Sequence, residues 1–423
     1  MSRVRFGIGV CLLLAASAMT GQPDSTSAAV DRARRLAKLW REMESAHPPA
    51  AAEISTRLTD IALEYLEQKD PPQAIELLSE AVARDPGNGS ALANLILAYL
   101  KHEDFDFAGF YLEQATQTTD RRNPDPQIYL AIGDLYAARN RLQEALSAWD
   151  YYRRLGGSDP RVLTEVERMR KEFPIGQGQR LLQSEHFALY TDASIPEEMA
   201  NRVEEHLEQE YRTQSAFFGT ELPGGPHVVI VYEGRAYFSL VSVPTWVSGI
   251  FDGKIRVSLE APAKWTAALR AVLSHELTHA FVRHASRGHA PGWLHEGLAQ
   301  WFEGKRVLRG EFRQMLARQP FYSLAEMEGN LARRADRAAT RRNYVEALGL
   351  VEYLMQGRGP GAIACVVSGL GQGSTLEEAL LRETGFTPAE LLAGFRNWAG
   401  LSQRRSAART GKSFESSATF DVP

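Results

Sequence analysis

The sequence predicts a chain in two parts, an all-α unit of helical repeats followed by an α+β domain. In the first half, an aromatic residue and an alanine recur at a fixed spacing, which is typical of stacked helix pairs. After residue 184, strand patterns alternate with an amphipathic helix, and longer helical patterns follow. The chain has 423 residues, which is enough to bury two separate hydrophobic cores.

Residues 1–18 have the order of a secretory signal peptide. Arg3 and Arg5 precede an apolar stretch that ends in Ala16-Ser17-Ala18, a small-residue cleavage site. The apolar stretch is shorter than the roughly 20 residues that a membrane-spanning helix needs, and an uncleaved anchor is the alternative. We therefore expect a periplasmic or secreted protein with no stable membrane insertion once the signal is removed.

The net charge argues against a nucleic-acid partner, and the number of cysteines argues against disulfide bonds. The formal net charge of -4 indicates no nucleic-acid-binding surface. Cys11 leaves with the signal, so that Cys365 alone remains and no internal disulfide can form. Stability must then come from packing and from any bound metal.

Residues 19–50 are expected to form a flexible leader and a short helix. Ser, Thr, Gly and Pro are frequent in residues 19–29. An apolar face predicts a helix from Val30 to about Glu44, and Pro48-Pro49 ends it.

Residues 51–172 repeat with a period of 34 and then 37 residues, which places three extra residues near 120–124. An aromatic residue is followed nine residues later by an alanine in each unit, as in Tyr65 and Ala74, Tyr99 and Ala108, and Tyr136 and Ala145. Closely crossed helices need a large residue opposite a small one. This pattern resembles the tetratricopeptide family, which implies a solenoid that binds a protein partner. A plain helical bundle without a recognition role is the alternative.

The second domain is expected over residues 184–400, after a linker at 173–183 that is marked by Pro174, Gly176 and Gly178. Strands are predicted at 187–190 and 228–232, with a helix at 196–218 between them. In residues 249–259, apolar residues alternate with Arg256 and Ser258, which predicts a half-buried strand at a sheet edge. A long helix is predicted to start near Ala263.

That helix carries His275, Glu276 and His279 in the pattern HExxH. Residues at i and i+4 lie one above the other on a helix, so both imidazoles can reach one metal ion. Glu276 is then turned beside them, toward an open coordination position. A second predicted helix follows Pro291-Gly292 and reads WLHEGLAQWF over residues 293–302.

HExxH followed by WLxEGLAxWF resembles the peptidase MA-like family, which are gluzincin zinc metallopeptidases with a zincin-like α+β domain. It is also similar to the helices of aminopeptidase-N-like enzymes. The resemblance implies that zinc (Zn2+) is held by His275, His279 and Glu296. No GxMEN-type string is present, so the resemblance does not extend to aminopeptidase specificity. Imidazole and carboxylate ligands also admit other first-row metals.

The implied reaction is peptide-bond hydrolysis. Zinc lowers the pKa of its bound water and polarises the scissile carbonyl, while Glu276 takes the proton and returns it to the leaving amine. The resemblance also assigns Tyr344, which precedes a Tyr353-Leu354 pair, as the donor that stabilises the oxyanion. A core aromatic is the alternative for Tyr344.

Further residues are expected around this centre. Glu303 lies two helical turns after Glu296, on the same face, where it can orient a ligating histidine, and a solvated carboxylate is the alternative. By the resemblance, Gly249, Ile250 and Phe251 form a strand that aligns the substrate backbone, although Phe251 and Trp246 can equally fill the core. The remaining nearby histidines, His284, His289 and His295, are expected on the surface or in a loop.

Together these observations predict an exported zinc metallopeptidase that acts on a peptide or protein substrate, with repeats that recruit a protein partner or that substrate. Two alternatives stay open. One is a non-catalytic tetratricopeptide scaffold with a metal-binding zincin fold, and the other is an amidase that acts on cell-wall material. Residues 401–423 are rich in Ser, Ala, Arg and Thr and are expected to form a loose tail.

Overall fold

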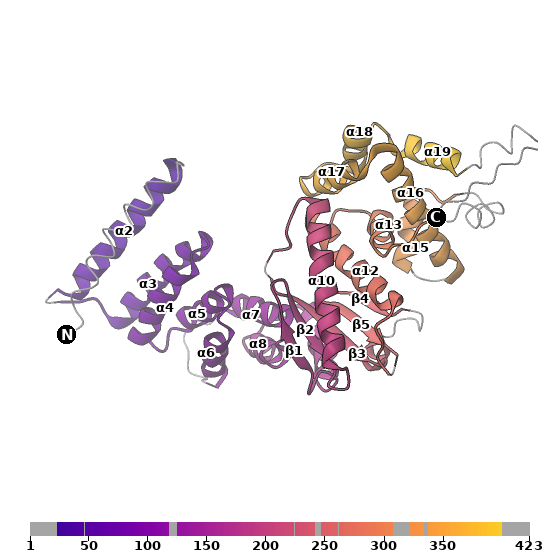
Figure 1. The fold of residues 1–423 in the computed structure, drawn as a ribbon. Helices are drawn as coiled ribbons and strands as arrows, with labels where there is room; N and C mark the ends of the chain where they lie inside the picture. Colours follow the sequence, from indigo (N-terminus) through magenta and orange to yellow (C-terminus); the bar gives the residue numbers. More distant parts are fainter. Residues whose placement is uncertain are drawn as a thin grey trace, which may run out of the picture. The chain divides into compact units, whose positions relative to one another are not determined.

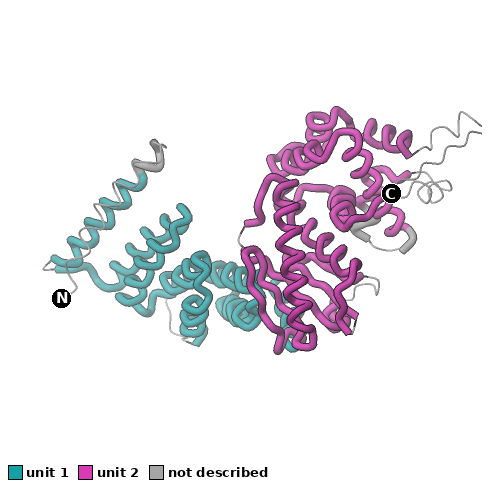
Figure 2. Tube along the Cα trace, viewed as in Figure 1, with its two compact units in different colours: residues 1–174 teal, residues 175–423 magenta. Residues whose placement is uncertain are grey.

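The computed structural model describes residues 23–45, 47–117, 125–223, 225–241, 247–260, 262–307, 321–333 and 337–399. They belong to two compact units, residues 1–174 and residues 175–423 (Figures 1 and 2). The predicted signal peptide, the three extra residues near 120–124, Trp246 and the predicted tail lie outside the described residues. Within the described ranges, every helix is too short or too polar to span a bilayer.

The first unit is built from consecutive helix pairs, as the repeat predicts. The two helices of each pair pack against each other, and each pair packs against the next pair along the chain. After α2 (Pro23–Met43) come α3 (Ala51–Glu67), α4 (Pro71–Arg84), α5 (Gly89–Lys101), α6 (Phe105–Gln117), α7 (Pro126–Ala138), α8 (Leu142–Arg154) and α9 (Pro160–Glu172).

Polar caps and prolines set where these helices start. The side chains of Asp70, Asn88, Asp125 and Asp159 each accept a hydrogen bond from a backbone N–H in the first turn of the following helix. Proline occupies the first helical position after three of them, where its missing N–H has no partner to lose. The Asp-Pro pairs at 125–126 and 159–160 therefore start helices.

The turn inside each helix pair has the same backbone in all three repeats. Lys69, Glu103 and Asn140 take φ values of 61°, 63° and 60°, in the left-handed region. They follow the repeat tyrosines by four residues each, so they have the 34- and 37-residue spacing of the repeat. Because the same turn recurs at the repeat spacing, the units repeat in backbone conformation as well as in amino-acid sequence.

Small residues lie where the helices cross. The repeat alanines are fully buried, and Gly133 lies so close to the Trp149 indole that a Cβ at this position would overlap the ring. The prediction of a large residue against a small one is confirmed, with the buried alanines being Ala74, Ala108 and Ala145.

The prediction of a flexible leader over residues 19–29 is wrong for its described part, because α2 starts at Pro23. Proline at the first helical position favours the helix, and the apolar face that follows packs Leu36, Trp40 and Met43 against the first repeat. The polar residues that suggested a leader lie in the first turns of this helix.

The second unit contains a five-stranded sheet in the order β1-β2-β3-β5-β4. The three central strands are parallel, and the two edge strands pair antiparallel to their neighbours. The strands are β1 (Arg180–Gln183), β2 (Phe187–Thr191), β3 (His227–Glu233), β4 (Gly249–Phe251) and β5 (Ile255–Leu259). β1 lies inside the segment for which the sequence predicts a linker, and its short, largely exposed run gives no alternation to detect.

Two predictions about residues 249–259 are wrong. The segment forms two strands, and β5 lies inside the sheet while β4 forms the edge. Arg256 is 0% exposed, because a second apolar cluster around Tyr232 and Tyr237 covers that face of the sheet. The Arg256 guanidinium contacts Asp252 at 3.2 Å and the Tyr232 hydroxyl at 2.8 Å, and it lies 4.2 Å from the centre of the Tyr237 ring.

Helices complete the unit. α10 (Glu197–Phe218) and α12 (Ala267–Ala285) share the main core with one face of the sheet, while α11 (Ala236–Leu240) belongs to the cluster on the other face. The described part of the unit also contains α13 (Gly292–Phe302), α15 (Leu324–Arg333), α16 (Arg337–Arg358), α17 (Pro360–Gly371), α18 (Leu376–Thr384) and α19 (Pro388–Trp398). α13 packs against both α12 and α16.

Candidate metal centre

One side of helix α12 is buried in the core, and the two histidines lie on its other side. Leu269, Leu273, Leu277 and Phe281 recur every four residues and are buried in the main cluster. His275 and His279 are offset by two residues from this row, which turns them to the opposite side of the helix. Their ring centroids are 4.8 Å apart.

Glu296 on α13 meets these imidazoles. Its Oε2 lies 3.6 Å from His275 Nε2 and 4.0 Å from His279 Nε2, and all three side chains are mostly buried. Donor atoms around a tetrahedral zinc ion, with bonds of about 2.1 Å, are separated by roughly 3.4 Å. The donor set and its spacing therefore fit a metal ion held between the two helices.

Gly297 fixes the position of Glu296. A Cβ at residue 297 would lie 2.5 Å from the carbonyl oxygen of Ala347 and 2.6 Å from Val351 Cγ2, both on α16. Glycine is therefore needed for α13 to approach α16 so closely. The Gln300 amide strengthens this contact by donating to the carbonyl oxygens of Glu296 at 3.0 Å and Tyr344 at 2.8 Å.

Glu303 holds His275 from the other side of the ring. Its Oε2 lies 3.0 Å from His275 Nδ1, and Lys305 Nζ contacts its Oε1 at 2.6 Å. Burial alone raises the pKa of Glu303, but the hydrogen bonds from His275 and Lys305 outweigh it and lower the pKa. An ionised carboxylate only accepts, so Nδ1 donates and Nε2 is directed to the ligand position.

The centre favours positive charge. Burial lowers the pKa of His275, but the carboxylates of Glu296, Glu303 and Glu276 act in the opposite direction and raise it to about 10. Three carboxylates around two imidazoles make a site whose charge a divalent cation would balance.

Glu276 lies against β4, the edge strand of the sheet among the described residues. Its side chain is buried, and a Cβ at Gly249 would overlap its Oε1. Glycine at this position in β4 therefore leaves the space that the Glu276 carboxylate occupies. The neighbouring side chains pack elsewhere, with Phe251 against the main core and Ile250 against the cluster on the other face of the sheet.

The structure brings most of the predicted residues together and leaves one role undecided. The motif residues, Glu303 and the Gly249 backbone share one site. The contacts described for Tyr344 join its backbone to α13 through Gln300, and its role as oxyanion donor stays a prediction.

The burial of two histidines, of which His295 lies beside the centre, is not expected from the sequence. His295 is partly buried, and its ring centroid lies 5.7 Å from that of His279, so the prediction of a surface or loop residue is wrong for it. The sequence does give one indication that His295 lies near the centre, since it directly precedes Glu296. His206 on α10 contacts Ser274 Oγ, 3.1 Å away, and burial lowers its pKa. His206 and Ser274 are 68 residues apart, so no local sequence pattern predicts their contact. By contrast, His289 is exposed and His284 contacts Thr220 at 3.5 Å.

A second group of metal-binding residue types, Glu185, His186 and Glu208, has a structural explanation. Glu208 accepts hydrogen bonds from Ser184 Oγ at 2.7 Å, from His186 N at 2.9 Å and from His186 Nδ1 at 2.6 Å. The carboxylate thereby joins α10 to the turn between β1 and β2.

Comparison with known families agrees with both units. Residues 226–400 match the Peptidase MA superfamily, and residues 65–124 match the tetratricopeptide repeat. No curated protein matches the chain. The second unit therefore contains a Peptidase MA superfamily domain, and the first contains tetratricopeptide repeats, as the sequence predicts.

Proposed function

We propose that the chain is an exported zinc-dependent metallopeptidase that hydrolyses peptide bonds, with repeats that recruit a protein partner or substrate. The observation that carries the proposal is the convergence of His275, His279 and Glu296 next to Glu276, which lies against the edge strand β4. The order of the first 18 residues supports export to the periplasm or the medium.

The residues present fit zinc. His275 Nε2, His279 Nε2 and the Glu296 carboxylate would hold the ion and leave a coordination position open. When bound there, zinc supplies Lewis acidity, which acidifies a water and polarises a carbonyl.

Glu276 is the residue that moves the proton. Its carboxylate is buried beside the histidines, so it takes a proton from the attacking water and delivers it to the leaving nitrogen. Removal from bulk water raises the strength of its interactions with the reacting groups. Glu303 keeps His275 in the tautomer and orientation that the ligand role needs.

Strand β4 aligns the substrate. It forms an edge of the sheet, so an extended peptide can add to its backbone at residues 249–251. The scissile bond of such a peptide lies near Glu276, because Gly249 contacts that carboxylate. Tyr344 remains the proposed donor to the oxyanion.

The test is the Glu276→Gln variant. Glutamine keeps the size of the side chain and removes the base, so we expect hydrolysis to fall by about 10²–10⁴-fold while zinc content is retained. Metal analysis of purified protein and mass spectrometry of a peptide-library digest, with chelator-treated wild type alongside, measure the two quantities. Glu377→Gln, an exposed carboxylate on α18, is the matched control.

The same experiment separates the alternatives. Hydrolysis that is unchanged in Glu276→Gln would contradict the mechanism. A wild type that binds metal but cleaves no peptide would indicate the scaffold. Release of fragments from purified cell wall, without cleavage of any peptide in the library, would indicate the amidase.

A further inference from the structure

Helix α6 in the second repeat exposes two large aromatic side chains. Phe107 is 53% exposed and Phe110 is 55% exposed. Phe107 stacks on Tyr99 with ring centroids 5.4 Å apart, Tyr99 stacks on Tyr111 at 5.7 Å, and Phe110 meets Tyr111 edge-on at 5.2 Å. We call Phe107, Phe110 and Tyr111 the α6 aromatic face. Because its rings support one another, they are already ordered for binding.

A row of acidic side chains runs beside this face. Asp106 and Glu113 are spaced four and three residues from Phe110, so they lie along one side of the same exposed surface. The Asp106 side chain is 97% exposed, and its contact with Arg141 is long, at 3.9 Å. Residues 102–117 contain four acidic residues and no lysine or arginine.

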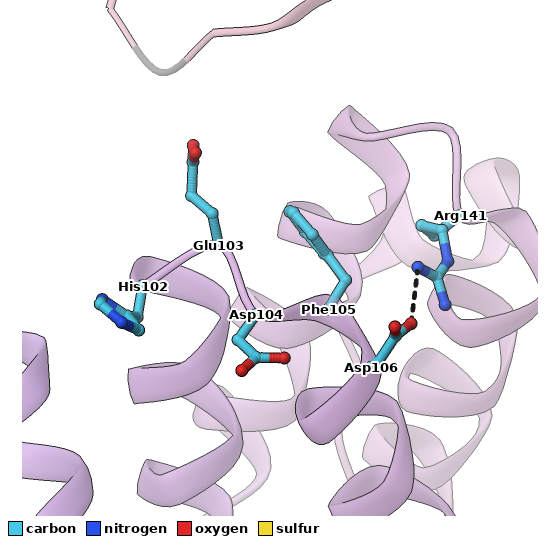
Figure 3. A pocket seen from close by; sticks show the side chains of 6 residues that line it. All are labelled: His102, Glu103, Asp104, Phe105, Asp106 and Arg141. Atoms are coloured by element: carbon cyan, nitrogen blue, oxygen red, sulfur yellow. Dashed lines mark ion pairs between the residues drawn. The ribbon is translucent and has the colours of Figure 1, made fainter. Parts of the chain in front are cut away.

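The acidic row continues into a hollow at the start of α6, with a volume of about 450 Å³. Figure 3 shows the lining side chains across the turn between α5 and α6, with Arg141 at one end and Asp106 facing it. The lining residues are His102, Glu103, Asp104, Phe105, Asp106 and Arg141. Glu103 pairs with Arg139 at 2.6 Å and Arg141 pairs with Glu144 at 2.5 Å. With Asp104 and Asp106, four carboxylates therefore lie around two guanidinium groups. The hollow therefore extends the negative charge beyond the end of the helix.

We propose that the α6 aromatic face and its acidic row bind a basic amphipathic helix of a partner protein. Two parallel rows at helical spacing, one apolar and one acidic, are matched by a helix with an apolar row and a Lys/Arg row. The charge complementarity selects basic partners and disfavours acidic ones. This inference rests on the proposed recruitment role of the repeats and names the surface and the chemistry of the partner.

The experiment measures binding of a fluorescent 18-residue helical peptide of leucine and lysine to the full chain. The Glu276→Gln background prevents hydrolysis during the measurement. We expect the peptide to bind, and the double variant Phe107→Ser/Phe110→Ser to weaken binding at least about 10-fold, because exposed aromatic anchors dominate such interfaces. The same peptide with glutamate in place of lysine is expected to bind at least about 10-fold more weakly.

A second variant tests the charge. Asp106→Asn/Glu113→Gln is expected to weaken binding by about 3–10-fold and to reduce its dependence on salt, since screened attraction is removed. The matched charge control is Asp60→Asn/Glu67→Gln, two exposed carboxylates on α3. The matched apolar control is Leu381→Ser, which is 52% exposed in the other unit. Both controls should leave binding unchanged, and circular dichroism melts verify that all variants fold.

Several results would overturn the inference. Equal binding of the lysine and glutamate peptides, or binding that the phenylalanine variant leaves unchanged, would each do so. A chain that self-associates until Phe107→Ser/Phe110→Ser makes it monomeric would show that a second copy covers this face. Binding that appears only after residues 401–423 are deleted would assign the face to the chain's own tail. Peptide hydrolysis by the wild type is measured separately, so that its failure is distinguishable from a failure of binding.

Discussion

Among the residues that the structure describes, the first unit buries two charged side chains, Arg32 and Glu172, beside the uncharged polar side chains of Ser55, Thr59 and Asn94. The second unit instead buries seven charged side chains, namely Glu208, Lys254, Arg256, Glu276, Arg342, Glu346 and Glu352. Burying a charge is unfavourable unless a partner compensates it. The first unit thus depends mainly on apolar packing that repeats along the chain, whereas the second unit buries charges at the candidate site, in the β4–β5 hairpin and on helices α10 and α16.

The compensation is visible in the peptidase unit away from the metal centre. Arg342 Nε contacts Glu346 at 2.7 Å on α16, and the other Glu346 oxygen accepts from the Tyr322 backbone N–H at 2.9 Å. Glu352 accepts from the Val307 backbone N–H at 2.7 Å. Buried carboxylates therefore anchor the chain on both sides of residues 308–320 to one helix.

We expect a methyl group added at a crowded glycine to lower the activity when it lies beside the candidate site of the second unit, and to lower the folding stability when it lies in the repeats. Gly249→Ala places a Cβ on the Glu276 carboxylate, and we expect hydrolysis to fall by about 100-fold, the cost of a small displacement of a catalytic group. Steady-state kinetics on a cleaved peptide measure this. Gly361→Ala, where the added Cβ has no neighbour within 4 Å, should be silent. Wild-type activity in Gly249→Ala would contradict the contact.

In the repeats, the corresponding change is Gly133→Ala. Its Cβ would overlap the Trp149 ring, so we expect a loss of about 1–3 kcal/mol of folding stability from overpacking, with hydrolysis of a short peptide unchanged. Urea denaturation followed by tryptophan fluorescence measures the stability. Gly357→Ala, which has open space around the new methyl group, is the control and should not destabilise the chain. A stable Gly133→Ala variant would show that the helix pair can relax.

A charge removed next to the metal centre should act on metal affinity more than on folding. Glu303→Gln loses the charged acceptor of His275 Nδ1, and we expect zinc affinity to fall by about 10–100-fold. Competition with a chromogenic chelator measures the affinity. Glu377→Gln, an exposed carboxylate on α18, serves as the control. Unchanged affinity would mean that His275 is oriented by its helix alone.

The smallest effect is expected at Glu208 and depends on pH. Burial alone raises the pKa of Glu208, but hydrogen bonds from Ser184 and His186 outweigh it and lower the pKa below its unfolded value. A lowered folded pKa gives stability that is present above the unfolded pKa of about 4.3 and is lost as pH falls through the folded pKa. Glu208→Gln should therefore cost about 1 kcal/mol at pH 7 and progressively less below pH 4.

Denaturant titrations at several pH values measure this difference, with Glu205→Gln, an exposed neighbour on α10, as the control. A penalty that stays constant down to pH 3 would show that the Glu208 charge does not contribute.

The parts of the molecule that local rules determine are those that the sequence predicts well. Ala74, Ala108 and Ala145 repeat because each helix pair packs in the same way, so that a spacing suffices to find them. The candidate metal centre also depends on short spacings, since His275 on α12 and Glu303 at the end of α13 are only 28 residues apart.

Features that depend on distant partners could not be predicted. Arg256 has the pattern of an exposed residue, and its burial depends on Tyr232 from another strand and on Tyr237 from a short helix. His206 and Ser274 meet across 68 residues. At the start of α18, Ser374 with Glu377 and Thr375 with Glu378 both have the spacing of a capping box, and the structure forms the second.

The bracing of Arg256 against Asp252 under the β4–β5 hairpin has a consequence for the choice of substrate. The edge strand is ordered when the protein folds, so a docking peptide loses only its own conformational freedom. Under the proposed function, such a rigid template accepts only chains whose backbone hydrogen-bonding groups are available. Unfolded proteins and extended loops would then be cleaved, while segments locked in helices or in the interior of sheets would be spared.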